Sequence, residues 1–319
     1  MKKLIAFIIF FMTTLLLTSC NMPSVYSKDF FELDTYINVN ITTTNGKEHL
    51  KQIQKIYNDV DKYCNYYESY NNQSIYDLNN NREIEANDLL LSIITIANDL
   101  ITKTNGYYNP LIGSLADKWK NAIKQNEVLD AKTIESELQS MKNSKLVIED
   151  NKITITGDAN LDLGGIAKGY ATNLVYEYLK ENNITNYLIN SGESNILLGE
   201  SKKGYRVGLS IPFSDKLYGV YIDKNIAIAT SSPAHQSFVK DDVLYHHIIS
   251  PFTGYPVNNF ESVNIITENS TYADAYSTAI FSMDLDTAKA FADSNDLGII
   301  LCDKQNIIYS KVDGIIEKI

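Results

Sequence analysis

The sequence contains little cysteine, and it lacks the patterns in which cysteine carries structure or chemistry. Only Cys20, Cys64 and Cys302 occur among 319 residues. A secreted domain stabilised by disulfides needs more cysteines than this. The absence of any Cys-x-x-Cys pair argues against a thiolate metal site. Cys64 and Cys302 could pair or could both be buried free thiols, and the sequence leaves both alternatives open.

Basic residues are also scarce relative to acidic ones. The chain has 28 Lys and Arg against 39 Asp and Glu, which gives a formal net charge of −11. Phosphate backbones are bound by clustered Lys and Arg, so an acidic surface argues against nucleic acid as a partner. It equally argues against a polybasic patch that would hold the protein on a membrane.

The first twenty residues have the features of an export signal. Lys2 and Lys3 precede an apolar run, Leu4 to Leu17, that is too short to span a bilayer comfortably. The run ends in Leu-Thr-Ser-Cys, which resembles a bacterial lipobox whose cysteine is lipidated. We therefore expect a lipoprotein signal peptide at 1–19 and a lipidated (palmitate-bearing) Cys20 that opens a tether at 20–29. The protein would then be anchored on the extracytoplasmic side of the bacterial cell membrane. An ordinary signal peptide with an incidental cysteine is the alternative.

Residues 30–319 read as one α+β domain. Neither an internal repeat nor a low-complexity tract nor an interior linker occurs, and the strands do not alternate regularly with helices, as they would in a doubly wound fold. A polar stretch rich in Asn and Tyr occupies 65–81. Hydrophobic periodicity predicts strands at 35–43, 161–163 and several places within 187–267, hairpins at 145–156 and 299–312, and helices at 50–60, 88–104, 132–141, 165–181, 274–283 and 286–294.

The segment Leu161 to Ala171 (LDLGGIAKGYA) has the character of a ligand-binding turn. Paired glycines between a strand and a helix let a ligand approach the backbone, and free N–H groups at a helix start suit phosphate oxygens. Lys168 adds a positive charge, and Asp162 can accept hydrogen bonds. The spacing fits neither GxGxxG nor the Walker pattern. A tight turn that uses glycine only for packing explains these residues about as well.

Two further segments carry polar side chains suited to chemistry. Asp274 and Thr278 lie four residues apart, so a helix places them on one face, where they suit an oxygen-loving cation such as Mg²⁺. An acidic residue near a helix start is the simpler interpretation. His246 and His247 are adjacent on a predicted strand and therefore point to opposite faces. One should face the interior and the other should face outward, and either could make only a structural hydrogen bond.

Taken in order, these motifs resemble those of the ApbE family, flavin transferases formerly described as thiamine-biosynthesis lipoproteins. The family's DxGGIAKGYA matches 162–171, its HHIxDPxTGYP matches 246–256 with one change, and its ADALAT-like segment matches 273–278. Shorter matches occur at 33–35, 74–79, 109–119 and 229–232. The resemblance implies an ApbE-like, T-fold-like α+β domain with FAD as substrate and Mg²⁺ as cofactor. It further implies transfer of FMN to a Ser or Thr hydroxyl of an acceptor protein, with release of AMP.

The resemblance also assigns roles to residues of this sequence. The metal ligands would be the Gly165 carbonyl, Asp274 and Thr278, with Ser277 as a further candidate. Asp162 and Lys168 would contact FAD, and His247 is our candidate for the general base, because a histidine titrates near working pH. The acceptor would be an exported or membrane redox protein with a Ser/Thr flavinylation motif. The FAD pocket would be lined by Leu33, Tyr70, the region around Trp119, His247 and Ile249.

The sequence departs from the family at three positions and leaves two other functions open. Ser250 and Asn109 each replace an Asp, and Glu193 stands in the family's Gly-Gly-[Asp/Asn] segment. Substrate positioning or acceptor choice could differ for these reasons. One alternative is a Mg²⁺-dependent pyrophosphatase that cleaves FAD to FMN and AMP. The other is a flavin-binding lipoprotein without catalysis, although a pure binder has no need of the Asp274 and Thr278 pair.

Overall fold

An eight-stranded antiparallel sheet forms the centre of the computed structural model, which describes residues 22–318 except 223–224, 235, 304–305 and 313–315. The expected signal peptide and Cys20 lie outside these residues. In spatial order the strands are β1 (Ser24–Glu32), β2 (Thr35–Thr43), β6 (Tyr187–Ser191), β7 (Asn195–Leu198), β10 (Ile226–Ser231), β13 (Ser262–Thr267), β14 (Gly298–Asp303) and β15 (Asn306–Lys311).

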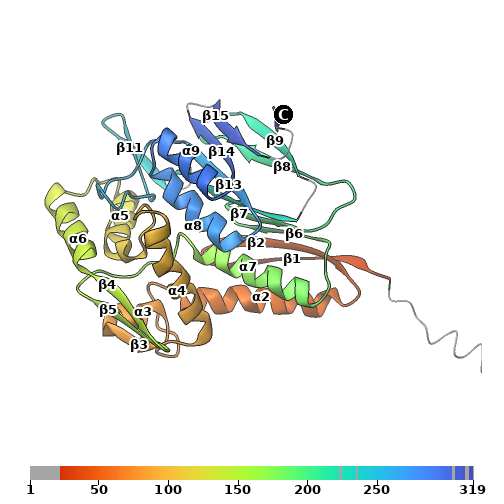
Figure 1. The fold of residues 1–319 in the computed structure, drawn as a ribbon, viewed down its shortest axis with the longest axis horizontal. Coiled ribbons are helices and arrows are strands. Elements are labelled where there is room, and N and C mark those ends of the chain that lie inside the picture. Colours follow the sequence, from red (N-terminus) through yellow and green to blue (C-terminus); the bar gives the residue numbers. More distant parts are fainter. Residues whose placement is uncertain (1–21, 223–224, 235, 304–305, 313–315, 319) are drawn as a thin grey trace, which may run out of the picture.

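Helices cover one face of this sheet. They are α2 (Gly46–Tyr63), α7 (Ala167–Glu181) and α8 (Ser270–Phe281), with α9 (Leu285–Ser294) beside α8 (Figure 1). In α2 the apolar residues recur at helical spacing, so that one stripe is buried while the other side stays polar. This stripe is Leu50, Ile53, Tyr57 and Val60. Unlike α2, α8 is buried on nearly every side, which makes it a central element of the core.

A small second sheet covers the opposite face. Its strands are β8 (Tyr205–Ser210), β9 (Leu217–Ile222) and β16 (Ile316–Lys318). Successive side chains of a strand point to opposite faces, and β7 shows this clearly. Leu197 joins the core under the helices, whereas Leu198 joins a separate cluster with Val207 and Val220 of the small sheet. The large sheet therefore separates two apolar cores.

A second group of elements lies to one side of the large sheet in Figure 1. A three-stranded sheet in the order β3-β5-β4 and a two-stranded hairpin accompany its helices. The elements are α3 (Ile75–Asn81), β3 (Glu83–Glu85), α4 (Asp88–Lys103), the 3-10 helix η1 (Pro110–Ile112), α5 (Gly113–Gln125), α6 (Ala131–Asn143), β4 (Lys145–Glu149), β5 (Lys152–Thr156), β11 (Ser237–Lys240) and β12 (Val243–His246).

Most of the predicted elements are confirmed. The strand at 35–43 is β2, the helix at 88–104 is α4, and the hairpin at 145–156 is the pair β4 and β5. Its turn lies at Asp150, whose φ of 53° is the left-handed conformation that such tight hairpins require. The α+β prediction is confirmed as well, because antiparallel sheets and helices form one domain.

Three features of the sequence-based prediction are wrong. Ser24–Asp29, which the sequence analysis assigns to a short tether, pairs with β2 as part of β1. Leu161–Leu163 is not a strand, because its backbone bonds the Asn79 side chain and the Pro110 carbonyl of η1 instead of a neighbouring strand. The polar stretch at 65–81 contains α3, which was not predicted, and neither was α5.

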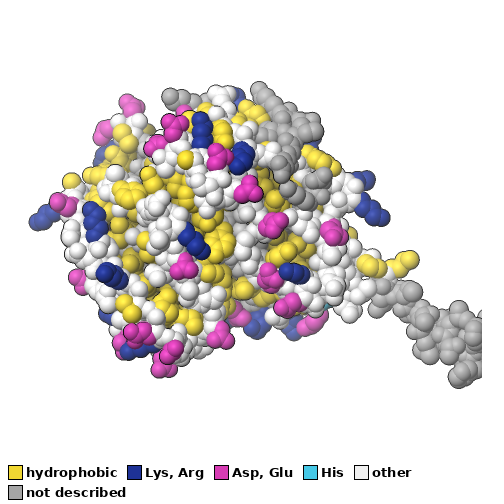
Figure 2. Space-filling model, viewed as in Figure 1, with side chains coloured by type: hydrophobic (Ala, Val, Ile, Leu, Met, Phe, Trp, Pro, Cys, Tyr) yellow, Lys and Arg dark blue, Asp and Glu magenta, His cyan; other side chains and the backbone are white. Residues whose placement is uncertain are grey.

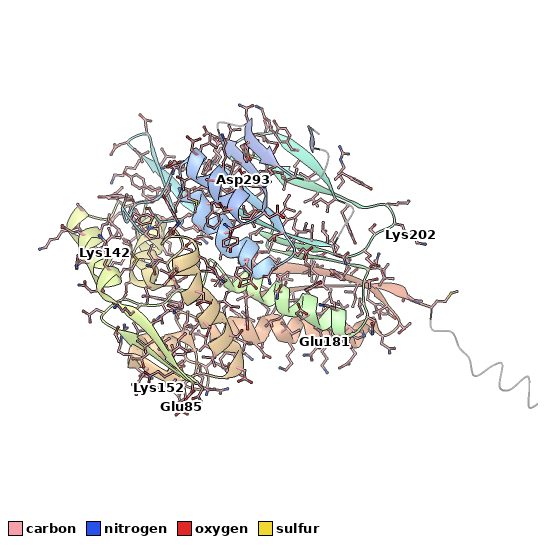
Figure 3. The ribbon with its side chains drawn as sticks, viewed as in Figure 1. Glu85, Lys142, Lys152, Glu181, Lys202 and Asp293 are labelled. Atoms are coloured by element: carbon pink, nitrogen blue, oxygen red, sulfur yellow. The ribbon has the colours of Figure 1, made fainter. Side chains whose placement is uncertain are left out.

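Among the described residues, charged side chains lie mainly at the surface and the two cysteines are unpaired. Lys and Arg side chains are scattered over the face shown in Figure 2 and form no basic patch there. Figure 3 shows charged side chains such as Glu181 and Lys202 at the periphery of the ribbon. Cys64 and Cys302 are both free, which settles the open alternative against a disulfide. None of the described helices has the length and apolar character needed to cross a membrane.

Candidate active site

Helices α7 and α8 meet at Gly169, and this contact positions Asp274. The Gly169 N–H donates a hydrogen bond of 2.8 Å to Asp274 Oδ2. The first turn of a helix has N–H groups without intrahelical partners, and Ile166, at the N-cap of α7, offers no side-chain acceptor. Asp274 is therefore the acidic cap of α7, supplied from another helix. Its carboxylate is buried but remains stabilised by this N–H and by the positive end of the helix dipole.

Thr278 and Gly165 lie next to this carboxylate. Thr278 follows Asp274 by one helical turn, and its hydroxyl donates to the Asp274 carbonyl at 3.3 Å. A Cβ placed on Gly165 would be 3.3 Å from Thr278 Oγ1, so the absent side chain leaves the two residues close together. The structure thus brings the three predicted metal-binding residues to one place. Ser277 is turned elsewhere, because its hydroxyl bonds the Ser231 hydroxyl and the Asp274 carbonyl.

Asp162 is held at the start of the glycine turn. Its Oδ1 accepts the Gly164 N–H at 2.7 Å, and its own N–H donates to the Pro110 carbonyl. The preceding residue, Leu161, is held at both N–H and C=O by the buried side-chain amide of Asn79. Burial raises the pKa of the Asp162 carboxyl, although the Gly164 N–H and the charges of Lys120 and Lys168 oppose this rise.

Tyr108 is a neighbour of this site that the sequence did not reveal. Its ring edge lies 3.4 Å from the position that a Gly165 Cβ would take, on a residue that is 4% exposed. The hydroxyl has no hydrogen-bond partner among the described residues. An unpartnered hydroxyl is a property of the packed structure, so no pattern in the sequence could have indicated it.

The two adjacent histidines have different surroundings, as predicted. His246, the last residue of β12, is fully buried, whereas His247 is exposed. The Ile248 N–H donates to His246 Nδ1, and His246 Nε2 lies 2.9 Å from the Val257 carbonyl. These contacts require a proton on Nε2 and none on Nδ1. Burial lowers the pKa of His246 to about 4, so the ring is neutral near pH 7. It also packs edge-on against Phe281 of α8.

Comparisons with known proteins place this geometry in a family. The ApbE family model matches residues 33–301. The chain belongs to the ApbE family. It is 29% identical over 223 residues to the FAD:protein FMN transferase of Klebsiella pneumoniae, covering 65% of this chain and 69% of that protein. It is 26% identical over 323 residues to the enzyme of that name from Haemophilus influenzae, covering 94% and 93%.

Solved ApbE structures share the fold. The ApbE protein of Thermotoga maritima superposes with a TM-score of 0.79 at 25% identity and covers 92% of this chain and 97% of its own. The flavin transferase ApbE of Vibrio cholerae superposes with a TM-score of 0.73 at 21% identity, covering 93% and 97%. The ApbE-like fold expected from the motifs is therefore confirmed.

The donor set fits Mg²⁺ better than a metal that needs many acidic or thiolate ligands. Within the described part of the chain, no group of three His, Cys, Asp or Glu is placed to hold a metal ion. Mg²⁺ takes few protein ligands and completes its shell with water and phosphate oxygens. Asp274 Oδ1 accepts no hydrogen bond from the described residues, since only Oδ2 is used by Gly169. Thr278 follows one turn later on the same helix, and Gly165 lies close to the Thr278 hydroxyl.

The residues predicted to line an FAD pocket have varied positions. Leu33 lies in the tight turn between β1 and β2 with a φ of 53°. Tyr70 packs edge-on against Tyr63 at the end of α2, and Ile249 is buried. Trp119 is fully buried, and its Nε1–H donates to the Gly254 carbonyl at 2.8 Å. This hydrogen bond links α5 to the turn after His247, and the buried indole ring is not exposed in this structure.

The three departures from the ApbE pattern preserve local turns. Ser250 Oγ accepts the N–H groups of Phe252 and Thr253, as a carboxylate at this position could. Asn109 Oδ1 accepts the Leu111 N–H and so caps η1. Glu193 adopts a φ of 61° and donates its N–H to the Asn190 side chain. At Ser250 and Asn109 the turn is retained and a negative charge is lost.

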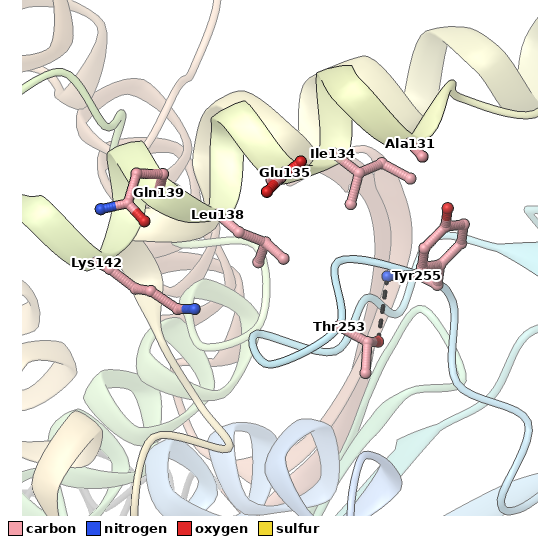
Figure 4. Close-up of a pocket in the computed structure, with 8 residues that line it drawn as sticks. All are labelled: Ala131, Ile134, Glu135, Leu138, Gln139, Lys142, Thr253 and Tyr255. Atoms are coloured by element: carbon pink, nitrogen blue, oxygen red, sulfur yellow. Dashed lines mark hydrogen bonds between the residues drawn. The ribbon is translucent and has the colours of Figure 1, made fainter.

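A concave region near the turn at 250–256 lies apart from the predicted site residues. It has a volume of about 280 Å³ and lies between α6 and the turn, where Thr253 Oγ1 accepts the Tyr255 N–H (Figure 4). None of the predicted site residues lines it. The lining residues are Ala131, Ile134, Glu135, Leu138, Gln139, Lys142, Thr253 and Tyr255.

Gly169→Ala should disrupt the site through packing alone. The new Cβ would lie 2.3 Å from the Ser270 carbonyl oxygen and 2.5 Å from Asp274 Cβ, so the two helices must separate. We expect the free energy of unfolding to fall by about 1–3 kcal/mol, as measured by urea denaturation. Gly208→Ala is the control, because its methyl meets only the Leu217 side chain at 3.3 Å. Equal stability of the two variants would contradict the tight helix contact.

The buried neutral state of His246 should make stability depend on pH. Its pKa of about 4 in the folded protein lies below the value of about 6.5 in the unfolded chain. Below pH 6.5 the unfolded state therefore binds a proton that the folded state does not. We expect the free energy of unfolding to fall by about 2 kcal/mol more between pH 7 and pH 5 in the parent than in His246→Gln. The same pH dependence in both proteins would contradict this assignment.

Proposed function

We propose that this protein is a Mg²⁺-dependent FAD:protein FMN transferase. An acceptor Ser or Thr hydroxyl attacks the phosphorus on the FMN side of the FAD pyrophosphate. The new phosphoester forms as the pyrophosphate P–O bond breaks, and AMP leaves. The convergence of Gly165, Asp274 and Thr278 beside the start of α7 supports this proposal most strongly. The curated name of the relatives from Klebsiella pneumoniae and Haemophilus influenzae supports it independently.

The residues around this convergence have complementary tasks. Asp274, the Thr278 hydroxyl and the Gly165 carbonyl would hold Mg²⁺, which would supply positive charge to balance the pyrophosphate. Asp162 and Lys168 flank the glycine turn and would contact FAD. The turn itself leaves the backbone open to phosphate oxygens at a helix start.

His247 is our candidate for the base that takes the proton of the acceptor hydroxyl. Of the two adjacent histidines, the buried His246 is poorly suited to this role. His246 receives the Ile248 N–H on Nδ1, and its Nε2–H is directed to the Val257 carbonyl, so neither nitrogen can take up a proton without losing a contact. His247 is exposed at the end of the same strand, where an acceptor protein can approach it.

The acceptor is proposed to be an exported or membrane redox protein that carries a Ser/Thr flavinylation motif. The proposed location, on the extracytoplasmic side of the membrane through a lipid on Cys20, would bring enzyme and acceptor together. Since β1 begins at Ser24, only four residue steps separate Cys20 from the fold. Such a segment spans at most about 14 Å. A lipid on Cys20 would therefore keep the domain close to the membrane surface.

Incubation with FAD and Mg²⁺, with and without a membrane fraction, tests the reaction type. Transfer predicts AMP release that depends on the acceptor, together with a protein band that keeps flavin fluorescence after denaturing electrophoresis. Mass spectrometry should find an added FMN on one exported protein. FMN and AMP released equally without acceptor would indicate the pyrophosphatase instead. Unchanged FAD in every reaction would leave only a flavin-binding protein.

Asp274→Ala should abolish most of the activity. The change removes a charged metal ligand and the cap of α7, and we expect FMN transfer to fall by at least about 100-fold, because a metal contributes several kcal/mol of charge stabilisation. Added Mg²⁺ should restore activity only in part. Asp293→Ala is the control, since Asp293 is exposed and pairs with Lys311 (Figure 3). Full activity of Asp274→Ala would refute the assigned metal site.

His247→Ala should slow the chemical step while FAD still binds. Loss of a general base costs about 100-fold or more in rate, which single-turnover labelling at saturating FAD would measure. The pH profile of the parent should show an acidic limb, where the rate falls as the base is protonated, and the variant should lack it. His247→Gln serves as the conservative control and should be equally slow. A full transfer rate for His247→Ala at saturating FAD would show that another group is the base.

A further inference from the structure

Tyr108 lies against the proposed metal site but is not used by the mechanism above. It follows α4, and its N–H donates to Thr104 Oγ1 at 3.0 Å, which fixes the backbone. The space where a Gly165 Cβ would be is bordered by Tyr108 Cε2 at 3.4 Å and by Thr278 Oγ1 at 3.3 Å. The aromatic ring and a proposed metal ligand therefore flank the same glycine.

The Tyr108 hydroxyl is both buried and unsatisfied. Tyr108 is 4% exposed, and its hydroxyl has no partner among the residues that the structure describes. A buried polar group without a hydrogen bond is destabilising, whereas a phenylalanine would fill the same space without that penalty. Other buried tyrosines avoid this problem, as the Tyr57 hydroxyl does by bonding Thr172 Oγ1 at 2.8 Å. The free protein thus gains nothing from the oxygen on Tyr108.

The groups around Tyr108 indicate what kind of partner the hydroxyl would take. The ordinary pKa of a tyrosine hydroxyl is about 10. The hydroxyl therefore keeps its proton at neutral pH and can donate a hydrogen bond. The partner must bring an acceptor oxygen to the space beside Gly165 and Thr278. In the proposed function, the atoms brought to that space are the pyrophosphate oxygens of FAD.

We propose that the Tyr108 hydroxyl donates a hydrogen bond to a pyrophosphate oxygen of bound FAD and thereby helps to hold the dinucleotide in place. This inference rests on the proposed function, since it names a further contact of the same site. It makes Tyr108 a substrate-binding residue whose oxygen is satisfied only in the complex. Riboflavin has no phosphate, so its affinity should not depend on the Tyr108 hydroxyl.

Tyr108→Phe tests this proposal, because it removes only the oxygen. The full-length protein is titrated with FAD in Mg²⁺ buffer without acceptor, and chromatography confirms that the FAD stays intact. We expect the dissociation constant for FAD to rise about tenfold, which corresponds to about 1.4 kcal/mol. The dissociation constant for riboflavin should change less than twofold. The melting temperature of the ligand-free variant should equal or exceed that of the parent.

Tyr57→Phe is the matched control. It removes a buried hydroxyl that has a partner, so it should lower the melting temperature and leave FAD affinity unchanged. An FAD dissociation constant for Tyr108→Phe within twofold of the parent would overturn the inference. An equal loss for FAD and riboflavin would overturn it too, because the hydroxyl would then contact the flavin ring. If the parent itself binds no FAD, the proposed function fails together with this inference.

Discussion

The hydrogen bond from the Gly169 N–H to Asp274 Oδ2 is the contact on which the site depends. It joins two helices whose residues are 105 positions apart in the chain. A buried carboxylate is tolerated only when it is hydrogen-bonded or paired, and here the unpaired N–H of a helix start meets that need. Neither group would be satisfied without the other. The contact also requires glycine, because a Cβ at position 169 would overlap the Ser270 carbonyl.

The large sheet holds the two helices in the relation that this bond needs. α8 packs on β10 and β13 in the middle of the sheet, and α7 lies between α8 and α2. The Tyr57 hydroxyl of α2 bonds Thr172 of α7, so a polar contact reinforces the apolar one. Because Asp274 and Thr278 lie on one helix turn, fixing the first also fixes the second. The geometry of the site is thus a consequence of how the core packs.

Local patterns were sufficient for the elements that follow a regular period. The alternation in Thr35–Thr43 and the stripe in α2 mark their buried faces directly. α3 has only seven residues and is rich in asparagine, so no stripe marks it. Its signal was the capping box of Ser74 and Asp77, which satisfies two N–H groups reciprocally. A sequence reading that looks only for apolar periodicity misses a helix of this kind.

The remaining differences arise from contacts that are distant in sequence. Leu161–Leu163 has the composition of a strand, but the Asn79 amide takes the place of a neighbouring strand at Leu161. Trp119 matches a motif near a ligand pocket, yet the Gly254 carbonyl accepts its N–H in the core. The motifs at 162–171 and 273–278 lie close together in the structure. The motifs did not distinguish side chains that could contact a ligand from side chains, such as Trp119, that pack in the core.

The two histidines show how such a division of labour follows from physics. Adjacent side chains of extended backbone point to opposite faces, and here the buried His246 ends β12 while the exposed His247 follows it. The buried His246 ring is tolerated only in its neutral form. Its contacts with the Val257 carbonyl and the Ile248 N–H favour that form. Its edge-on contact with Phe281 then ties the strand end to α8, the helix of Asp274 and Thr278. The buried His246 therefore anchors the chain segment that carries the exposed His247.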